Sequence, residues 1–296
     1  MNGKTLRNLF ALAVAAVPAS LEAPRMAQTS LASATAELAD APAAIGAAVT
    51  RVAANVAGTH LGFDTNVYPG DDAMNAWKRS GTYEWVGYYL PAPCHKDDSW
   101  SGRRQHLIDN GWGLAVIYVG QQTWGKTPRA GSRSSRSATC AANLVNAEQG
   151  ILDADDAIAQ TAAEGFPSGT AIFLDIEHMN TVPSAMREYY SAWTQRVLDD
   201  GRYRPAYYAH NANAQTIYAD VRLVLDQRGL VSDPPFWIAG GSNFGRDRSP
   251  QEVGHQFAAV WQGVLDTWEK HDKVRLPIDV SVAAVPSPSS AQFASD

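Results

Sequence analysis

The chain has 296 residues, of which 45% are hydrophobic, and it carries a formal net charge of −6. This is the composition of a globular protein with enough apolar residues for a sizeable core. The negative charge argues against general nucleic-acid binding, because that function needs a clustered basic face to neutralise phosphates.

Residues 1–19 have the pattern of a secretory signal peptide. Lys4 and Arg7 precede an apolar run over 9–17, and the small residues of Val17-Pro-Ala19 suit cleavage by a signal peptidase. The alternative is a buried amphipathic helix. The run is too short to span a bilayer, so we predict a secreted or cell-envelope protein without stable membrane insertion. Residues 20–57 are rich in Ala and lack aromatic side chains, which predicts a linker.

The first half of the remaining chain alternates predicted strands with predicted helices. Strands are expected over 60–64, 84–90 and 112–119. Helices are expected over 71–79 and 100–110, with Asp71 or Asp72 as the cap of the first. A long loop over 120–137 leads into a helical stretch from about 138 to 164. Loops of this length in a compact domain are usually functional or disordered.

The second half continues this alternation less regularly. The predicted strands cover 170–178, 204–210, 236–239, 257–262 and 276–282. Helices are predicted over 183–200 and 212–228, but none follows the sixth or seventh strand. Residues 58–284 therefore predict an α/β domain, a (β/α)8 TIM-like barrel with an abbreviated second half. A doubly wound sheet is the alternative, although it usually has a Gly-rich phosphate loop, which is absent. The Ser/Pro-rich residues 285–296 are predicted to form a disordered tail.

Two acids end the fourth predicted strand. Asp175 and Glu177 are two residues apart and so share one face of that strand, with Cα atoms about 6.6 Å apart. Like charges at this range push their pKa values apart, so that one carboxyl group can act as an acid while the other stays ionised. The structural alternative is a strand that ends in solvent with two hydrated acids.

Other polar and aromatic residues are predicted at the same end of the barrel, where barrel enzymes carry their active sites. Asp64 and Asp279 bring the predicted catalytic acids to four. Aromatic rings stack on sugars while carboxylates and amides bind hydroxyl groups, so this combination suits a carbohydrate. The predicted substrate-binding residues are Tyr88, Tyr118, Gln122, Tyr208, His210, Trp237, Trp261 and Gln262. For Trp237 and Trp261 the alternative is barrel packing, and for His210 it is a structural histidine.

Export also bears on the two cysteines. In an oxidising compartment Cys94 and Cys140 are expected to form a disulfide, and the alternative is two unpaired, buried cysteines. Two cysteines without a nearby His pair do not predict a zinc site, and no cofactor is expected.

The strand ends resemble those of the family 25 lysozymes, which are barrel enzymes that cleave peptidoglycan glycan. A closer resemblance is to the glycoside-hydrolase-like domain family of secreted proteins. It is carried by Gly62-Phe-Asp-Thr65, Met74-x-x-Trp77, Gly111-Trp112, Ile117-Tyr-Val-Gly-x-Gln122, Asp175-x-Glu177 and Ser191-Ala-Trp193. It covers roughly residues 60–282.

The resemblance implies a role for each acid. Glu177 would protonate the glycosidic oxygen, Asp175 would stabilise developing positive charge, and Asp64 and Asp279 would orient these acids and bind sugar hydroxyls. We therefore predict a secreted glycoside hydrolase acting on a cell-wall or extracellular polysaccharide. The end of the third strand, Gly120-Gln-Gln122, departs from the lysozyme pattern, which leaves a non-catalytic carbohydrate-binding barrel as an alternative. A third reading is a metal-dependent hydrolase, because clustered oxygens also suit Mg²⁺ or Ca²⁺.

Overall fold

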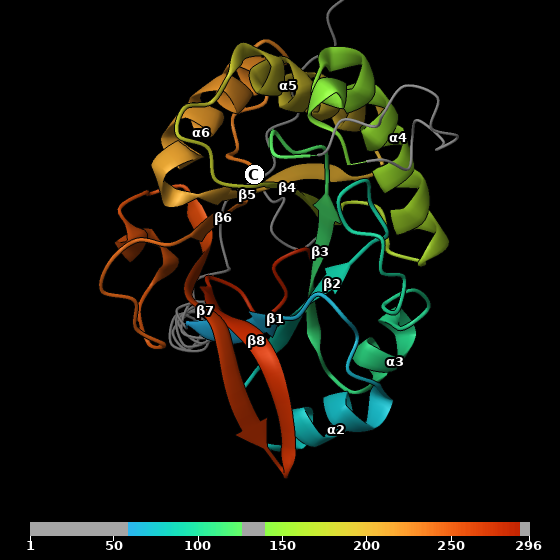
Figure 1. The fold of residues 1–296 in the computed structure, drawn as a ribbon, viewed down its shortest axis with the longest axis vertical. Helices are drawn as coiled ribbons and strands as arrows, with labels where there is room; N and C mark the ends of the chain where they lie inside the picture. The colour runs from blue at the N-terminus through green and yellow to red at the C-terminus, as the bar shows by residue number, and fades with distance from the viewer. Residues whose placement is uncertain (1–58, 126–139, 291–296) are drawn as a thin grey trace, which may run out of the picture. The chain divides into compact units, whose positions relative to one another are not determined.

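Eight strands close into a single barrel in the order in which they occur along the chain (Figure 1). The computed structural model describes residues 59–125 and 140–290. The strands are β1 His60–Asp64, β2 Trp85–Tyr89, β3 Gly113–Val119, β4 Ala171–Ile176, β5 Arg204–His210, β6 Phe236–Ala239, β7 Ala258–His271 and β8 Val274–Ala283. The predicted α/β barrel is therefore confirmed.

Helices surround the barrel, with α4, α5 and α6 on one side and α2 and α3 on another (Figure 1). They are α2 Asp71–Arg79, α3 Arg104–Asp109, α4 Ala147–Ala163, α5 Ser184–Asp200 and α6 Asn211–Asp226, with short 3₁₀ turns η2 Ala142–Leu144 and η3 Pro250–Val253. In the described part of the chain no α-helix follows β6, in agreement with an abbreviated second half. None of these helices is long and apolar enough to cross a membrane.

One helix cap and two helix starts differ from the predicted ones. α2 has Gly70 before it and no side-chain cap, because Asp71 instead accepts a hydrogen bond from the Tyr68 hydroxyl at 2.6 Å. α3 is shorter than predicted and begins at Arg104. α4 begins where the Asn146 side chain accepts a hydrogen bond from the Gln149 backbone, which is a strong helix-start signal that the broad apolar pattern hid.

The last two strands form a long hairpin that replaces a predicted loop. The chain from 263 to 275, expected to connect two short strands, is itself mostly strand, and β8 runs antiparallel to both β7 and β1. The turn is Asp272-Lys273, whose positive φ angles of 43° and 70° suit a tight two-residue hairpin. An alternation of half-buried and exposed residues along β7 matches a strand with one face in solvent.

Inward-facing side chains fill the barrel below its mouth. Trp237 lies at the centre of this packing, with its ring 5.3 Å from that of Trp85 and 5.8 Å from that of Phe173. Only glycine leaves room for the Trp85 ring at position 62, because a Cβ atom there would lie 2.1 Å from Cε2 of that ring. At this level the barrel interior is therefore filled by packed side chains of the described residues.

The predicted disordered tail is wrong over residues 285–290, which cover the starts of β3 and β4. Ser287 Oγ and Ser289 Oγ accept hydrogen bonds from the backbones of Leu114 and Val116, and the Ser289 carbonyl accepts one from Ala171. These serines suggested a disordered tail in the sequence, but in the structure they accept hydrogen bonds from backbone groups near the starts of the strands. The predicted signal peptide, the linker, much of the 120–137 loop and residues 291–296 lie outside the described residues.

Candidate active site

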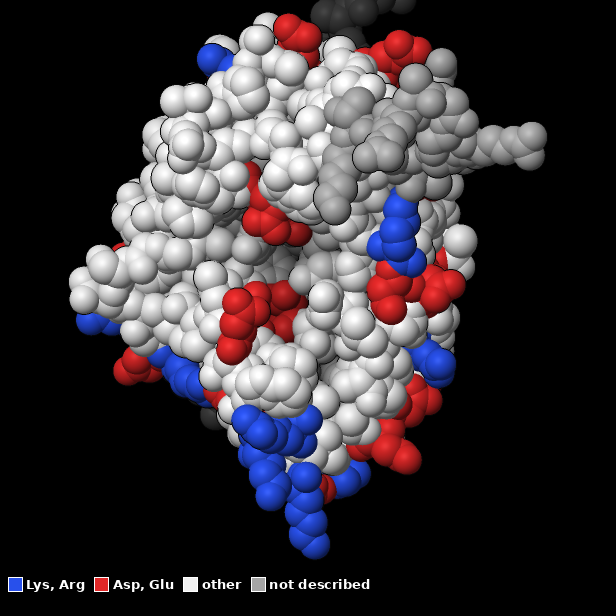
Figure 2. Space-filling model, in the orientation of Figure 1, with Lys and Arg blue, Asp and Glu red and all other residues white. Residues whose placement is uncertain are grey.

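Four acids gather where the strands end at one rim of the barrel. Asp64 of β1 and Asp279 of β8 are direct partners in an antiparallel pair, which places their Cα atoms about 4.5–5.5 Å apart. Asp175 is the second-last residue of β4, and Glu177 follows directly after that strand. Figure 2 shows acidic side chains on both sides of a hollow in this face. All four acids predicted from the sequence thus lie at the same end of the barrel.

A cavity of about 180 Å³ opens beside Asp64 and Asp279. It is also lined by Thr65, Asn66, Tyr89, Asp266, Pro277 and Ile278. Two larger cavities, of about 330 and 310 Å³, lie elsewhere and contain none of the four acids. Of these three cavities in the described residues, only the smallest is lined by acids at the rim where the parallel strands end, so we assign the candidate chemistry to it.

Asp64 is held by two neighbours and has almost no contact with water. Its Oδ1 accepts a hydrogen bond from the Tyr89 hydroxyl at 2.7 Å, and its Oδ2 accepts one from Gln262 Nε2 at 2.8 Å. The side-chain oxygen Oε1 of Gln262 in turn accepts a hydrogen bond from the Tyr208 hydroxyl at 2.7 Å. A Cβ atom on Gly87 would lie 2.7 Å from that of Asp64, so Gly87 leaves the room this acid needs.

Burial raises the pKa of Asp64 to about 7, and the nearby charge of Asp279 adds to the effect. The hydrogen bonds from Tyr89 and Gln262 oppose the rise but are outweighed. Burial also raises the pKa of Asp279, while the Asp266 backbone N–H that donates to it at 2.6 Å works in the opposite direction. Asp64 therefore holds a proton up to near neutral pH.

This proton predicts a pH-dependent stability. The unfolded chain releases the Asp64 proton near pH 3.8, whereas the folded protein keeps it until about pH 7. The free energy of unfolding is then expected to fall by roughly 2 kcal/mol between pH 5 and pH 7. Urea unfolding of Asp64→Asn should show a clearly smaller fall than the native chain. Equal slopes in the two proteins would contradict burial of Asp64 as the cause.

Asp175 and Glu177 form the second carboxyl pair. Burial raises the pKa of Asp175 well above its ordinary value, and the charges of Glu177 and Asp64 raise it further. Burial also raises the pKa of Glu177, against a smaller opposing effect of His178. Asp175 is buried, and its Oδ1 has no hydrogen-bond partner in the described residues, whereas Glu177 is partly exposed. The pair thus combines a buried acid with one that a ligand can reach.

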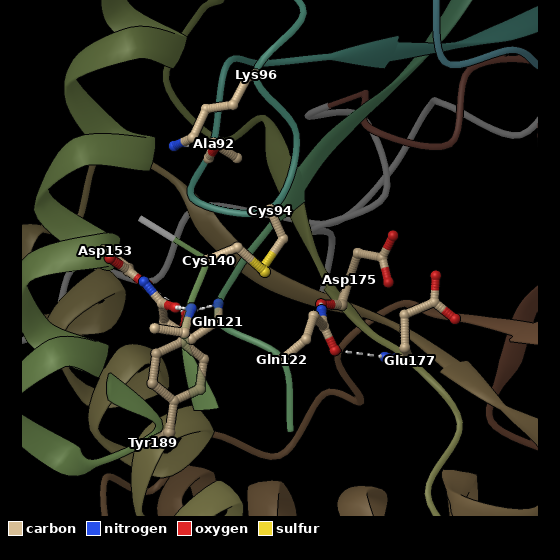
Figure 3. Close-up of a disulfide and its surroundings, with 11 residues drawn as sticks. Ala92, Cys94, Lys96, Gln121, Gln122, Cys140, Asp153, Asp175, Glu177 and Tyr189 are labelled. Carbon is tan, nitrogen blue, oxygen red and sulfur yellow. Dashed lines mark hydrogen bonds between the residues drawn. A yellow bond between two sulfur atoms is a disulfide. The ribbon is translucent and has the colours of Figure 1, made fainter. Parts of the chain in front are cut away.

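Gln122 fixes the backbone that carries this pair. Its Nε2 donates to the Asp175 carbonyl at 2.8 Å, and its Oε1 accepts from the Glu177 backbone N–H at 3.1 Å. Figure 3 shows both carboxylates projecting to the same side, away from Gln122. Since both ends of the Gln122 amide are used on backbone, this residue supports the acids, contrary to its predicted role in binding substrate.

The predicted disulfide between Cys94 and Cys140 is confirmed and lies beside this support (Figure 3). The residue after Cys140, Ala141, donates its backbone N–H to Gln121 Oε1 at 2.9 Å. The Gln121 backbone N–H donates to the Tyr189 hydroxyl at 3.0 Å. The disulfide therefore fixes the position of Ala141, which is hydrogen-bonded to Gln121, the residue before Gln122.

Four predicted substrate-binding residues lie away from the acids. Tyr88 and Tyr118 point outward from the barrel and donate to Glu164 at 2.5 Å and to Asp156 at 2.9 Å. Trp261 also points outward, donating to the Gly240 carbonyl at 2.7 Å. Trp237 points inward but is buried below Tyr208, and its ring nitrogen donates to Ser281. The indole rings are packing residues, as the structural alternative proposed.

The remaining predicted residues lie at the rim. Tyr208 and Gln262 belong to the hydrogen-bond chain that reaches Asp64. His210 is the last residue of β5 and caps the start of α6, where its Nδ1 accepts a hydrogen bond from the Ala212 backbone N–H. Its ring lies 4.7 Å from that of His178. Tyr89, which the sequence also places at the end of a predicted strand, and Asp266 are not among the predicted substrate-binding residues, yet both line the cavity.

Comparison with known proteins identifies the family. Residues 75–283 match the model of the Rv2525c-like, glycoside hydrolase-like domain. The chain belongs to this family. This agrees with the family predicted from the strand-end motifs, and no curated protein matches the chain.

Solved structures are similar to this chain at low sequence identity, and two of them have TM-scores above 0.5. An uncharacterized protein of B. stearothermophilus is 18% identical, with a TM-score of 0.51 over 76% of this chain and 95% of that one. The spore cortex lytic enzyme SleM of Clostridium perfringens is 17% identical, with a TM-score of 0.51 over 76% of this chain and 67% of that one. The Tat-secreted protein Rv2525c of Mycobacterium tuberculosis is 18% identical, with a TM-score of 0.46 over 79% of this chain and 98% of that one.

Proposed function

We propose that this protein is an exported glycoside hydrolase that cleaves a cell-wall or extracellular polysaccharide. The observation that carries the proposal is the pair Asp175 and Glu177, two acids of raised pKa at the mouth of a glycoside hydrolase-like barrel. Glycosidases use two carboxyl groups, one of which protonates the leaving oxygen. The fold neighbour SleM is a spore cortex lytic enzyme, which favours a cell-wall glycan as substrate.

Glu177 is the proposed proton donor because it is the member of the pair that a ligand can reach. In the free protein the deeper burial of Asp175 favours a proton there. In the reactive form the proton is on Glu177, whose pKa burial also raises, and Asp175 is ionised. Asp175 then stabilises the positive charge that develops on the bound sugar while Glu177 protonates the glycosidic oxygen. Asp64 and Asp279, with Tyr89 and Gln262, are proposed to bind sugar hydroxyls and orient the pair.

The test is incubation with purified wall and extracellular polysaccharides, followed by chromatography of the products. We expect at least one glycan to be shortened with release of new reducing ends. Binding without shortening would instead assign a carbohydrate-binding barrel. Loss of cleavage in a chelator would assign a metal-dependent hydrolase, although the described residues contain no group of three or more His, Cys, Asp or Glu side chains placed to hold a metal ion.

Gln122 is expected to act as a positioning residue in this reaction. Gln122→Ala leaves the Asp175 carbonyl and the Glu177 N–H without partners, which costs roughly 2 kcal/mol of stability. Loss of the fixed spacing should lower kcat about tenfold with little change in KM, because a small misplacement of catalytic groups is costly. A merely structural role would lower stability and leave kcat of the folded fraction unchanged. Thermal melts and steady-state kinetics on the same preparation separate the two.

Export is the proposed route to this substrate. The disulfide between Cys94 and Cys140 supports it, since disulfides persist in oxidising compartments. Expression of the full chain and N-terminal sequencing of the protein recovered outside the cell is the test. A mature N-terminus near residue 20 is expected, whereas retention of residues 1–19 would contradict a cleaved signal peptide.

A further inference from the structure

The β7–β8 hairpin extends from the cavity beside Asp64 and Asp279, here called the acid cavity. It presents an exposed face that combines aromatic and basic side chains. This face, here called the hairpin face, consists of Trp268 and Lys270 on β7 with Arg275 and Pro277 on β8. All four residues are exposed, while the alternate residues 267, 269, 271, 274, 276 and 278 are partly or fully buried. Lys270 pairs directly with Arg275, and Trp268 with Pro277, so the four side chains lie on one side of the hairpin.

The hairpin face is continuous with the acid cavity. Pro277 lines that cavity together with Asp279, which lies two residues further along β8 on the same face. From Asp279 to Arg275 the strand rises about 13 Å, a distance that more than one sugar ring can span. Figure 2 shows basic side chains gathered at the far end of the hairpin, beyond the acids that border the hollow. A chain bound in the cavity therefore has a direct path along this face.

The cations of this face are available to a ligand. Glu269 on the opposite face is paired with Arg246, and Asp272 in the turn is paired with Arg79. Lys270 and Arg275 form no ion pair with any residue of the described ranges. The Arg275 guanidinium lies 4.7 Å from the centre of the Trp268 ring, and Trp268 nevertheless remains 56% exposed. An aromatic platform and two positive charges thus occupy neighbouring positions.

We propose that the hairpin face is a binding subsite for a carboxylate-bearing sugar segment of the glycan whose adjoining ring occupies the acid cavity. Trp268 stacks on a sugar ring, and Arg275 and Lys270 bind carboxylates carried by that ring or the next. Because the Arg275 guanidinium lies so close to the Trp268 ring, a sugar that carries its own carboxylate can contact both side chains. A polyphosphate has no sugar ring to stack on Trp268. This assignment names the substrate class of the proposed hydrolase and rests on it.

The distribution of charge explains why such a subsite lies away from the acids. A cavity lined by acids offers no positive charge to an anionic sugar, while the cations further along the hairpin attract it. The glycan is then oriented with a less charged ring in the cavity and a charged segment on the hairpin. The attraction is screened by salt, because the face is exposed.

The experiment is calorimetric titration of the full chain carrying Glu177→Gln, so that the ligand keeps its length. The probes are oligogalacturonate, neutral chitin oligosaccharides of the same length, and inorganic polyphosphate. Oligogalacturonate is expected to bind roughly tenfold more tightly than the neutral probe at low salt, with the preference lost at high salt. Lys270→Ala with Arg275→Ala should remove this preference, and Trp268→Ala should weaken both sugars severalfold.

The matched control is Arg196→Ala with Arg228→Ala, which removes the same charge from exposed ion pairs of the helix layer. If the control variant binds oligogalacturonate as weakly as the hairpin variant does, the proposed subsite is wrong. The same conclusion follows if polyphosphate binds more tightly than oligogalacturonate. If the preference depends on Lys270 and Arg275 but the native chain shortens no glycan, the hairpin face stands and only the hydrolase assignment fails. If glycans are shortened and the preference is unaffected, only the hairpin face fails.

Discussion

Glu177→Gln is expected to lower glycan cleavage by about 10²–10⁴-fold, the contribution that a positioned general acid makes to a reaction. The amide keeps the shape of the side chain but cannot deliver a proton. Stability should not fall, because burial already disfavours the charged form of Glu177. Product release from the native substrate and the thermal midpoint, measured on one preparation, check both expectations.

A second variant shows whether the loss is specific. Glu188→Gln removes an acid from the exposed surface of α5 and should leave activity unchanged. If Glu177→Gln retains more than about a tenth of native activity, Glu177 is not the proton donor. Activity that survives this change but is lost in Asp175→Asn would reverse the two roles.

The order of the strands followed from the sequence because most of the barrel strands are buried on both faces. The run 204–210, for example, is nearly continuous in apolar and aromatic residues, as strands covered by helices are. Asp64, Asp175 and Glu177 could be placed together because the carboxyl ends of parallel barrel strands converge on one rim. Asp279 lies within the antiparallel strand β8 and reaches the same rim because it pairs with Asp64. Because these residues are Asp and Glu, acid and base chemistry could then be predicted at that rim.

The errors in the site came from reading strand ends without their two-residue period. On β2, Gly87 faces Asp64 inside the barrel, so Tyr89 faces inward and Tyr88 outward. On β3 and β7 the same count places Tyr118 and Trp261 on the outer side. Once the register of β2 against β1 is known, a two-residue count from Gly87 selects Tyr89.

Other features depend on contacts that no local pattern records. Ser289 satisfies the backbone of Val116 across 173 positions of the chain, and its own neighbourhood reads as a flexible tail. Gln122 was selected as a sugar ligand because amides bind hydroxyls, yet its two partners are backbone groups of the Asp175 strand end. Only the folded arrangement distinguishes an amide that binds backbone from one that binds substrate.

Loss of the disulfide is expected to destabilise the protein more than any other change considered for the fold. Cys94 and Cys140 are 46 positions apart, and closing a loop of that length is worth about 4 kcal/mol in the unfolded-chain entropy model. Replacing both cysteines with Ser should therefore lower the free energy of unfolding by about 2–4 kcal/mol. The corresponding fall in Tm is roughly 5–15 °C for a domain of this size.

Activity should fall along with stability in the Cys94→Ser, Cys140→Ser protein. Ala141, next to Cys140, is hydrogen-bonded to Gln121, and the adjacent Gln122 holds the backbone of Asp175 and Glu177. Freeing residue 140 therefore loosens the support of the acids, and kcat should drop even at temperatures where the variant is folded. Reduction of the native protein with dithiothreitol should reproduce both effects, and reoxidation should reverse them. Coincident urea transitions for the oxidised and reduced proteins would show that the 94–140 link does not constrain this barrel.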